Sequence, residues 1–142
     1  MRVMGIDYGD ARTGIAISDA GGVLVGQTCV ISHWSPEEMA RQTAELAVQS
    51  GVERLVVGLP RNMDGTEGSR AQLCRAFADK LQDLTGLPTV MWDERRTTVD
   101  AHRILSEAGR RGKKRKQVVD AVAASLILEG YLEYLNKSEN RR

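Results

Sequence analysis

The sequence predicts an α/β domain with a five-stranded mixed sheet, three antiparallel strands followed by two parallel ones, flanked by helices. Short apolar runs that end in turns recur along the chain. The first three follow one another across glycine-containing turns, as in an antiparallel meander. The later runs alternate with helical patterns, and such units need right-handed crossovers and parallel strands. The 142 residues suit one domain, which we place at residues 1–136.

The first part of the chain carries the three strands of the meander. Gly9 and Gly14 lie between the first two apolar runs, and Gly21-Gly22 precedes a third segment rich in β-branched residues. The first run ends in a carboxylate, Asp7, which is costly to bury unless a cation or hydrogen-bond donors meet it. We expect these strands at residues 3–6, 15–17 and 23–31.

Two helices and two further strands come next. Ser35-Pro36-Glu37-Glu38 offers an N-cap, a proline at the first helical position and a capping-box glutamate, and Gly51 ends that helix. A second helix is indicated by spaced apolar residues and is closed by Gly86 and Pro88. The apolar positions of this helix are Leu73, Phe77, Leu81 and Leu84. The strands are expected at residues 55–60 and 89–92, with a polar loop at residues 61–68.

The last part of the chain is predicted to be helical with one basic interruption. A third helix is expected after Thr97 or Thr98 and ends at Gly109. Residues 110–117 form a basic loop, and a final helix covers about residues 118–135. Residues 137–142 are expected to be a frayed polar tail.

The charge distribution is uneven, although the net charge is only +1. Between Arg95 and Lys116 there are nine lysines and arginines against two acids, so this segment carries +7 and the rest of the chain −6. A molecule polarised in this way can steer a polyanion to one face. The sequence therefore favours a nucleic-acid partner.

The cysteine spacing and the hydropathy favour a location in the cytoplasm. Cys29 and Cys74 are far apart and form no CxxC motif, and no apolar stretch approaches the roughly 18 residues of a membrane span. Nothing at the N-terminus resembles a signal peptide. We expect a cytoplasmic protein with no membrane partner.

Three carboxylates lie at positions where a charged residue is not needed to keep the protein soluble. Asp7 and Glu94 end predicted strands, where open α/β sheets place their ligands. Asp120 lies on the apolar side of the last helix, in line with Ala123, Ala124 and Ile127. Gathered together, the three acids would repel one another unless a hard cation, Mg²⁺ or Mn²⁺, bound between them. Zinc is not expected, because the histidines and cysteines lack ligand spacing.

Each acid also has a structural interpretation. Asp7 could be a turn residue that bonds the backbone at Gly9. Glu94 could pair with Arg95 or Arg96, and Asp120 could be an acid in the first turn of a helix, favoured by the helix dipole. The basic run could be a solvated loop. The histidines, cysteines and tryptophans are interpreted as structural: His33, His102, Cys29, Cys74, Trp34 and Trp92.

Four motifs resemble those of the YqgF family, described as pre-16S rRNA nucleases and Holliday junction resolvases of the RNase H-like superfamily. They are GIDYGDARTGIAISD at residues 5–19, VVGLPRNMDGTEG at 56–68, DERRTT at 93–98 and VVDAVAASLIL at 118–128. The resemblance implies an RNase H-like fold and a metal site of Asp7, Glu94 and Asp120. It also implies substrate roles for Arg12 and the loop after Pro60.

The function predicted on this basis is metal-dependent endonucleolytic hydrolysis of structured nucleic acid, first of all at the 5′ end of pre-16S rRNA. Catalysis is assigned to Asp7, Glu94 and Asp120. Branched DNA is the second substrate, and the chain is a monomer or a homodimer. Two alternative functions are also consistent with the sequence. The chain could be an ATP-binding relative of actin and the sugar kinases, or a non-catalytic nucleic-acid-binding module. The residues expected to hold the substrate are Arg12, Arg95, Arg110, Arg111, Lys113, Lys114, Arg115 and Lys116. Arg96, where relatives carry an apolar residue, is given no catalytic role.

Overall fold

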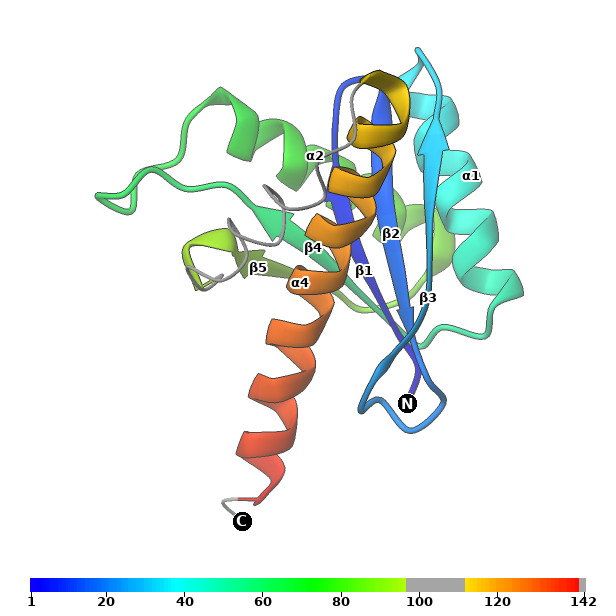
Figure 1. Ribbon diagram of the computed structural model, residues 1–142, viewed down its shortest axis with the longest axis vertical. Coiled ribbons are helices and arrows are strands. Elements are labelled where there is room, and N and C mark those ends of the chain that lie inside the picture. Colours follow the sequence, from blue (N-terminus) through cyan, green and yellow to red (C-terminus); the bar gives the residue numbers. More distant parts are fainter. Residues whose placement is uncertain (97–111, 141–142) are drawn as a thin grey trace.

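The protein, seen here as a computed structural model that describes residues 1–96 and 112–140, is built on one five-stranded sheet (Figure 1). Strand order is β3-β2-β1-β4-β5. The β1–β2 and β2–β3 pairs are antiparallel, and the β1–β4 and β4–β5 pairs are parallel. The predicted mixed sheet is therefore confirmed. The strands are β1 (Val3–Tyr8), β2 (Arg12–Ser18), β3 (Val25–Ser32), β4 (Arg54–Leu59) and β5 (Thr89–Asp93).

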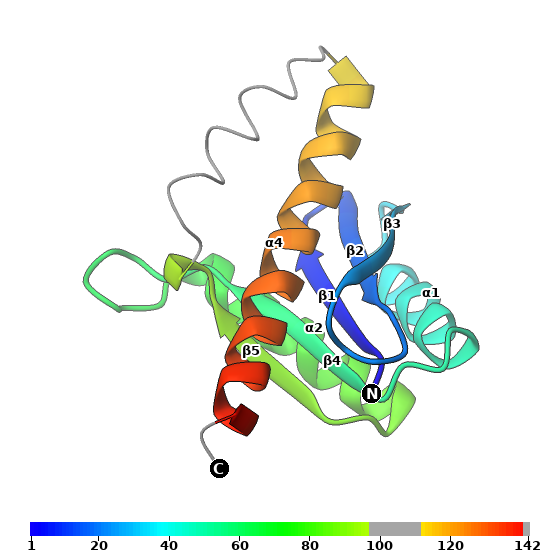
Figure 2. The same ribbon diagram turned by 60° about the horizontal axis from the view of Figure 1, so that its bottom comes forward.

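Helices cover both faces of the sheet (Figure 2). On one face lie α1 (Pro36–Gln49) and α2 (Ser69–Thr85), and on the other lies the long α4 (Gly112–Asn140). A short 3-10 helix, η1 (Glu94–Arg96), follows β5 directly. The predicted N-cap of α1 is confirmed, because the Glu38 backbone N–H donates to Ser35 Oγ at 3.3 Å.

Two apolar cores result from the alternation of side chains along the strands. In β1, Met4, Ile6 and Tyr8 pack with α1 and α2, whereas Val3 packs with α4. Asp7 is in register with Gly14 of β2, and its side chain therefore belongs to the α4 face. The period of two along β1 thus places a carboxylate under the long helix.

The prediction for the last helix was wrong at both ends. Residues 112–117, expected to be a loop, are helical, and so are residues 137–140 of the expected tail. Lysine, arginine and glutamine are good helix formers, and no proline or glycine interrupts the helix until Gly130. The pair Glu133–Lys137, with 2.8 Å between Oε1 and Nζ, supports the last turns. The predicted helix at residues 97–109, Arg110 and Arg111 lie outside the described residues.

Smaller differences concern β3 and α2. Val23 and Leu24 donate their backbone N–H groups to the Asp19 carboxylate, so they belong to a turn and β3 begins at Val25. In α2 the predicted positions Leu73 and Leu84 are half exposed, and the buried face is made instead by smaller residues with Phe77 and Leu81. None of the helices within the described ranges is long and apolar enough to cross a membrane.

Candidate metal centre

Asp7 lies close to the end of β1 and is only partly exposed to solvent. Burial is the largest cause that raises its pKa, from 3.8 to about 7, and the nearby charges of Glu94 and Asp120 raise it further. Arg70 acts in the opposite direction. No hydrogen bond from the described residues contributes to this pKa shift, in contrast to the turn role considered for Asp7. The three predicted acids therefore share one electrostatic neighbourhood.

Asp120 is brought to this neighbourhood by the close approach of α4 to β2. A Cβ at Gly14, the register partner of Asp7, would overlap the backbone carbonyl oxygen of Asp120. A glycine is therefore needed at position 14. Because α4 begins at Gly112, Asp120 lies more than two turns inside the helix. It is not a first-turn acid, so that interpretation was wrong.

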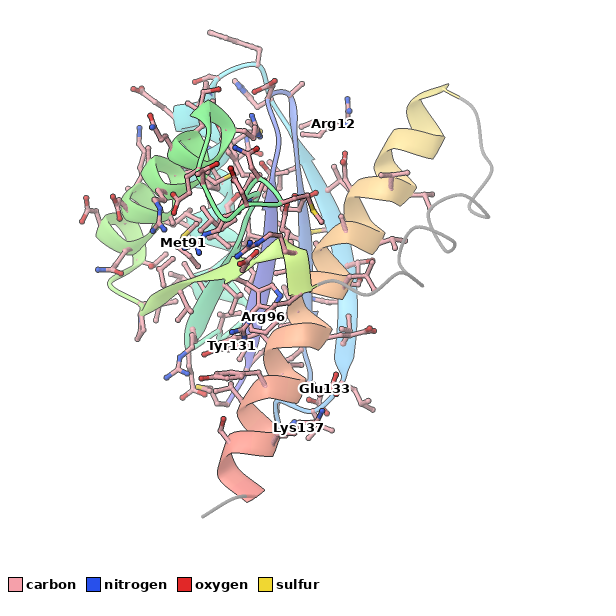
Figure 3. The ribbon with its side chains drawn as sticks, turned by 90° about the vertical axis from the view of Figure 1, so that its left-hand side faces the viewer. Arg12, Met91, Arg96, Tyr131, Glu133 and Lys137 are labelled. Atoms are coloured by element: carbon pink, nitrogen blue, oxygen red, sulfur yellow. The ribbon has the colours of Figure 1, made fainter. Side chains whose placement is uncertain are left out.

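The carboxylate of Asp120 is paired with Arg12. Arg12 Nε donates to Asp120 Oδ2 at 2.9 Å, and both side chains are partly buried. Figure 3 shows Arg12 beside the N-terminal half of α4. Arg12, for which the family resemblance implied a substrate contact, thus neutralises the charge of Asp120.

Glu94 begins η1 directly after β5, and its side chain lies over a glycine of the neighbouring strand. A Cβ at Gly58 would be 2.5 Å from Glu94 Oε1. Burial raises the pKa of Glu94, Arg70 lowers it, and Asp93 raises it. Glycines in β2 and β4 therefore make the room in which both Asp120 and Glu94 reach the face that carries Asp7.

The two arginines after Glu94 are occupied elsewhere. Arg95 pairs with Asp93 at 2.7 Å, and its Nη1 lies 3.5 Å from the carbonyl oxygen of Met63. Arg96 lies over the rings of Trp92 and Tyr134, with its guanidinium carbon 4.9 and 5.6 Å from the ring centroids. Figure 3 shows Arg96 farther toward the C-terminal end of α4 than Arg12, beside Tyr131. The ion pair considered for Glu94 with Arg95 or Arg96 is therefore absent from the described contacts, and Arg96 packs against aromatic rings.

The polar loop after Pro60 is folded on itself. Arg61 and Glu67 form an isolated β-bridge, and Glu67 also accepts hydrogen bonds from Arg75 at 2.6 and 2.8 Å. Asp64 caps the turn by accepting from the backbone and hydroxyl of Thr66. The loop projects from the body of the molecule (Figure 2) and carries Met63, which is 91% exposed.

Arg70, in the first turn of α2, is a site residue that the sequence did not indicate. Its guanidinium donates to Asp10 Oδ1 at 2.7 Å and to the carbonyl oxygen of Tyr8, and it lies 5.0 Å from the Tyr8 ring centroid. It lowers the pKa of both Asp7 and Glu94. Because its partners are some sixty residues away in the chain, no local pattern could have assigned it.

The donor chemistry of this cluster suits a hard divalent cation, although the ligands do not converge. All three side chains offer carboxylate oxygens. Burial is the largest cause of the raised pKa of Asp7, and the charges of Glu94 and Asp120 add a repulsion that a cation would relieve. Within residues 1–96 and 112–140, no three histidine, cysteine, aspartate or glutamate side chains stand close enough to hold one metal ion. Asp120 instead meets Arg12. A cation held by all three acids would therefore compete with Arg12 for Asp120.

Asp7→Asn is expected to stabilise the metal-free protein above pH 7. The folded-state pKa of this carboxyl lies above its unfolded value. Its ionisation therefore lowers the free energy of unfolding as the pH rises from about 4 to about 7, and the full decrease is reached above the folded pKa. The gain in the free energy of unfolding should be about 1 to 4 kcal/mol at pH 8. Urea unfolding at pH 5 and pH 8 in EDTA measures it.

Asp19→Asn is the matched control for this stability measurement. Hydrogen bonds from the Val23 and Leu24 backbone lower the pKa of Asp19, so its replacement should destabilise the protein at pH 8. A loss of stability in Asp7→Asn at pH 8 would contradict the burial and repulsion described for Asp7.

The chain is similar to known proteins along almost its whole length. A family model described as "RuvX: Holliday junction resolvase" matches residues 1–134. A protein of Halothermothrix orenii named "Putative pre-16S rRNA nuclease" is 50% identical over 137 residues, 96% of this chain and 98% of the relative. A protein of Moorella thermoacetica with the same name is 46% identical over 139 residues, 97% and 99% of the two chains.

Solved structures share the fold at low sequence identity. "T. thermophilus RuvC in complex with Holliday junction substrate" aligns with a TM-score of 0.61 and 16% identity, over 94% of this chain and 96% of that chain. Fowlpox virus resolvase, solved with Holliday junction DNA, aligns with a TM-score of 0.61 and 9% identity, over 95% and 99%. These likenesses confirm the predicted RNase H-like fold.

Proposed function

This chain belongs to the RuvX family, and we propose from that premise that it is a metal-dependent endonuclease acting on structured nucleic acid. The first substrate proposed is the 5′ end of pre-16S rRNA, the role named for its curated relatives. The single observation that supports the metal dependence is the grouping of Asp7 with Glu94 and Asp120 on one face of the sheet, where burial and then the charges of the other two acids raise the pKa of Asp7. The three acids lie near one end of the sheet, and no described residue donates a hydrogen bond to Asp7. This arrangement suits a bound cation.

Asp7, Glu94 and Asp120 would hold Mg²⁺ or Mn²⁺. When bound, such an ion activates water and stabilises the oxygen that leaves the phosphorus. Asp7 and Glu94 must be ionised to bind it, and Arg70 favours this by lowering the pKa of both. Arg12, whose Nε donates to Asp120, would contact a phosphate of the substrate from this position.

Basic residues would hold the phosphates of the substrate. Arg12 lies at the centre, and Arg95 lies by the loop after Pro60. The basic segment Lys113–Lys116 occupies the first turns of α4, within about 11 Å of Asp120 along the helix axis. Arg110 and Arg111, which precede this segment in the sequence and lie outside the described residues, are proposed to bind phosphates with it.

The experiment that tests this function is a cleavage assay with purified protein and Mg²⁺, Mn²⁺ or EDTA. We expect the pre-16S rRNA substrate to be cut at its 5′ end with either metal and to stay intact in EDTA. Cleavage that persists in EDTA would overturn the metal dependence. Binding without cleavage, indifferent to Mg²⁺ and unchanged in Asp120→Asn, would favour a non-catalytic nucleic-acid-binding module instead.

Holliday junction resolution is the second candidate function, favoured by the description of the family model. A four-way DNA junction has two strands to cut symmetrically, so this activity would need a dimer that presents two sites. Paired cuts in a four-way junction, together with a dimer in sedimentation experiments, would support it. Efficient cutting of the rRNA precursor by a monomer would favour the first proposal.

Replacing Lys113, Lys114 and Lys116 together by glutamine is expected to weaken binding and to flatten its salt dependence. For every phosphate that the protein no longer neutralises, the slope of log K against log salt should become shallower by about 0.7 to 0.9 units. Binding titrations from low to moderate salt, in EDTA, measure the slope. Lys137→Gln, at the other end of the same helix, is the control and should keep the wild-type slope.

A further inference from the structure

The ring of Trp34, interpreted from the sequence as structural, lies outside both apolar cores. Trp34 lies between β3 and α1 and is 86% exposed, whereas Trp92 is 7% exposed and packs against α4. A tryptophan is rarely left so open, because its large apolar surface gains free energy from burial. The exposed ring of Trp34 is therefore available to contact a binding partner.

The backbone around Trp34 is held in place on both sides. The His33 N–H donates to the carbonyl oxygen of Ala11 at 3.1 Å, which ties this segment to the β1–β2 turn. The Ser35 N–H donates to His33 Nδ1 at 2.9 Å, and Ser35 caps α1. The His33 ring stacks on Trp34, with centroids 5.5 Å apart and planes at 29°. Trp34 is thus an exposed aromatic surface on an anchored backbone, backed on one side by a second ring.

Trp34 lies at the end of the sheet that carries the candidate metal centre. Asp7 is in register with Gly14, Gly14 with Val30, and Arg12 with Ser32, two residues before Trp34. Strand spacing and rise put Trp34 roughly 15 Å from Asp7. Figure 1 shows the end of β3, the β1–β2 turn and the start of α4 together at the top of the molecule.

The surroundings of Trp34 suit a nucleic acid better than a protein. In the described chain, the segment around Trp34 contributes no second exposed large apolar side chain, whereas a stable protein interface needs many contact residues on each side. The acids that follow it are already paired, Glu37 with Lys80 at 3.6 Å and Glu38 with Arg41. Two arginines lie at the same end of the sheet, because Arg12 donates to Asp120 and Arg70 donates to the carbonyl oxygen of Tyr8.

We propose that Trp34, backed by His33, is a stacking platform for an unpaired base of the substrate strand a few nucleotides from the scissile phosphate. This inference rests on the proposed function and adds a substrate feature to it: a single-stranded segment beside the cleavage site. A base presents a flat π-face that an exposed indole can cover, whatever the sequence. The platform lies beside the meander edge of the sheet, opposite the loop that carries Met63.

The test is binding of a short single-stranded oligouridylate in EDTA, followed by tryptophan fluorescence. We expect binding to quench the emission in the wild type and in Trp92→Phe, because Trp34 is the ring that meets the base. Trp34→Ala should lose affinity by about 5- to 150-fold, the effect of one stacked base, with an unchanged salt slope. Trp34→Phe should keep most of the affinity.

Cleavage kinetics separate this inference from the function on which it rests. Trp34→Ala should raise KM for the rRNA substrate and leave kcat near the wild-type value. Wild-type affinity and KM in Trp34→Ala would overturn the platform while the nuclease stands. A wild type that neither binds nor cuts any nucleic acid would overturn both. A dimer that dissociates in Trp34→Ala with unchanged RNA affinity would show that the ring meets a second copy and would also overturn the platform.

Discussion

Asp7→Asn is expected to lower metal-dependent cleavage by at least about 100-fold, while the protein folds and binds nucleic acid as before. The amide is nearly the same size as the carboxylate but carries no charge for a cation. The cost of burying the charged carboxylate, and its repulsion by Glu94 and Asp120, disappear with the charge, so the variant should also be more stable in EDTA above pH 7. Single-turnover cleavage in Mg²⁺ and urea unfolding measure the two effects.

Asp10→Asn is the control for the effect on cleavage. Asp10 is three residues from Asp7, and its exposed side chain meets Arg70 at 2.7 Å. The control should keep most of the activity. Full activity in a clean preparation of Asp7→Asn would remove Asp7 from the mechanism, and equal losses in both variants would indicate a general disturbance of the β1–β2 turn.

Gly14→Ala is expected to damage stability and activity together. The added methyl group would overlap the carbonyl oxygen of Asp120, so α4 must move away from β2. Strain of this kind costs about 1 to 3 kcal/mol or more, and the same movement withdraws Asp120 from Asp7. Urea unfolding and the cleavage assay report the two losses.

Gly26→Ala, in β3, is the matched control within the same sheet. The nearest atom to an added Cβ is the carbonyl oxygen of Ile17 in β2, at an ordinary 3.5 Å. We expect wild-type stability within about 0.5 kcal/mol and wild-type cleavage. If Gly14→Ala behaves like this control, the close approach of α4 does not hold Asp120 at the centre.

The strand order and most helix ends could be predicted because their causes are local in the sequence. A short apolar run, a glycine turn or a Ser-Pro-Glu-Glu cap determines the backbone over a few residues. The three acids could also be chosen, because Asp7 and Glu94 end strands and Asp120 interrupts an apolar stripe. Their common neighbourhood then follows from the topology, in which the ends of β1 and β5 and the inner side of α4 meet.

The contacts that tune the site could not be predicted, because they join residues far apart in the chain. Arg12 meets Asp120 and Arg70 meets Tyr8 only after the sheet and α2 have formed. The basic segment before Val118 was expected to be a loop because of its dense charge, yet lysine and arginine also favour a helix. Trp34 was interpreted as structural, and no local pattern in the sequence indicates that its ring is exposed.

The most direct test of the metal centre is a pH titration of the Asp7 carboxyl carbon by NMR, in protein labelled with ¹³C-aspartate. Asp7→Asn identifies the resonance by its absence. In EDTA we expect the pKa of Asp7 to be about 7. In millimolar Mg²⁺ it should fall by more than about one unit, since a bound cation favours the charged form. A pKa that is the same with and without Mg²⁺ would contradict a metal site at Asp7.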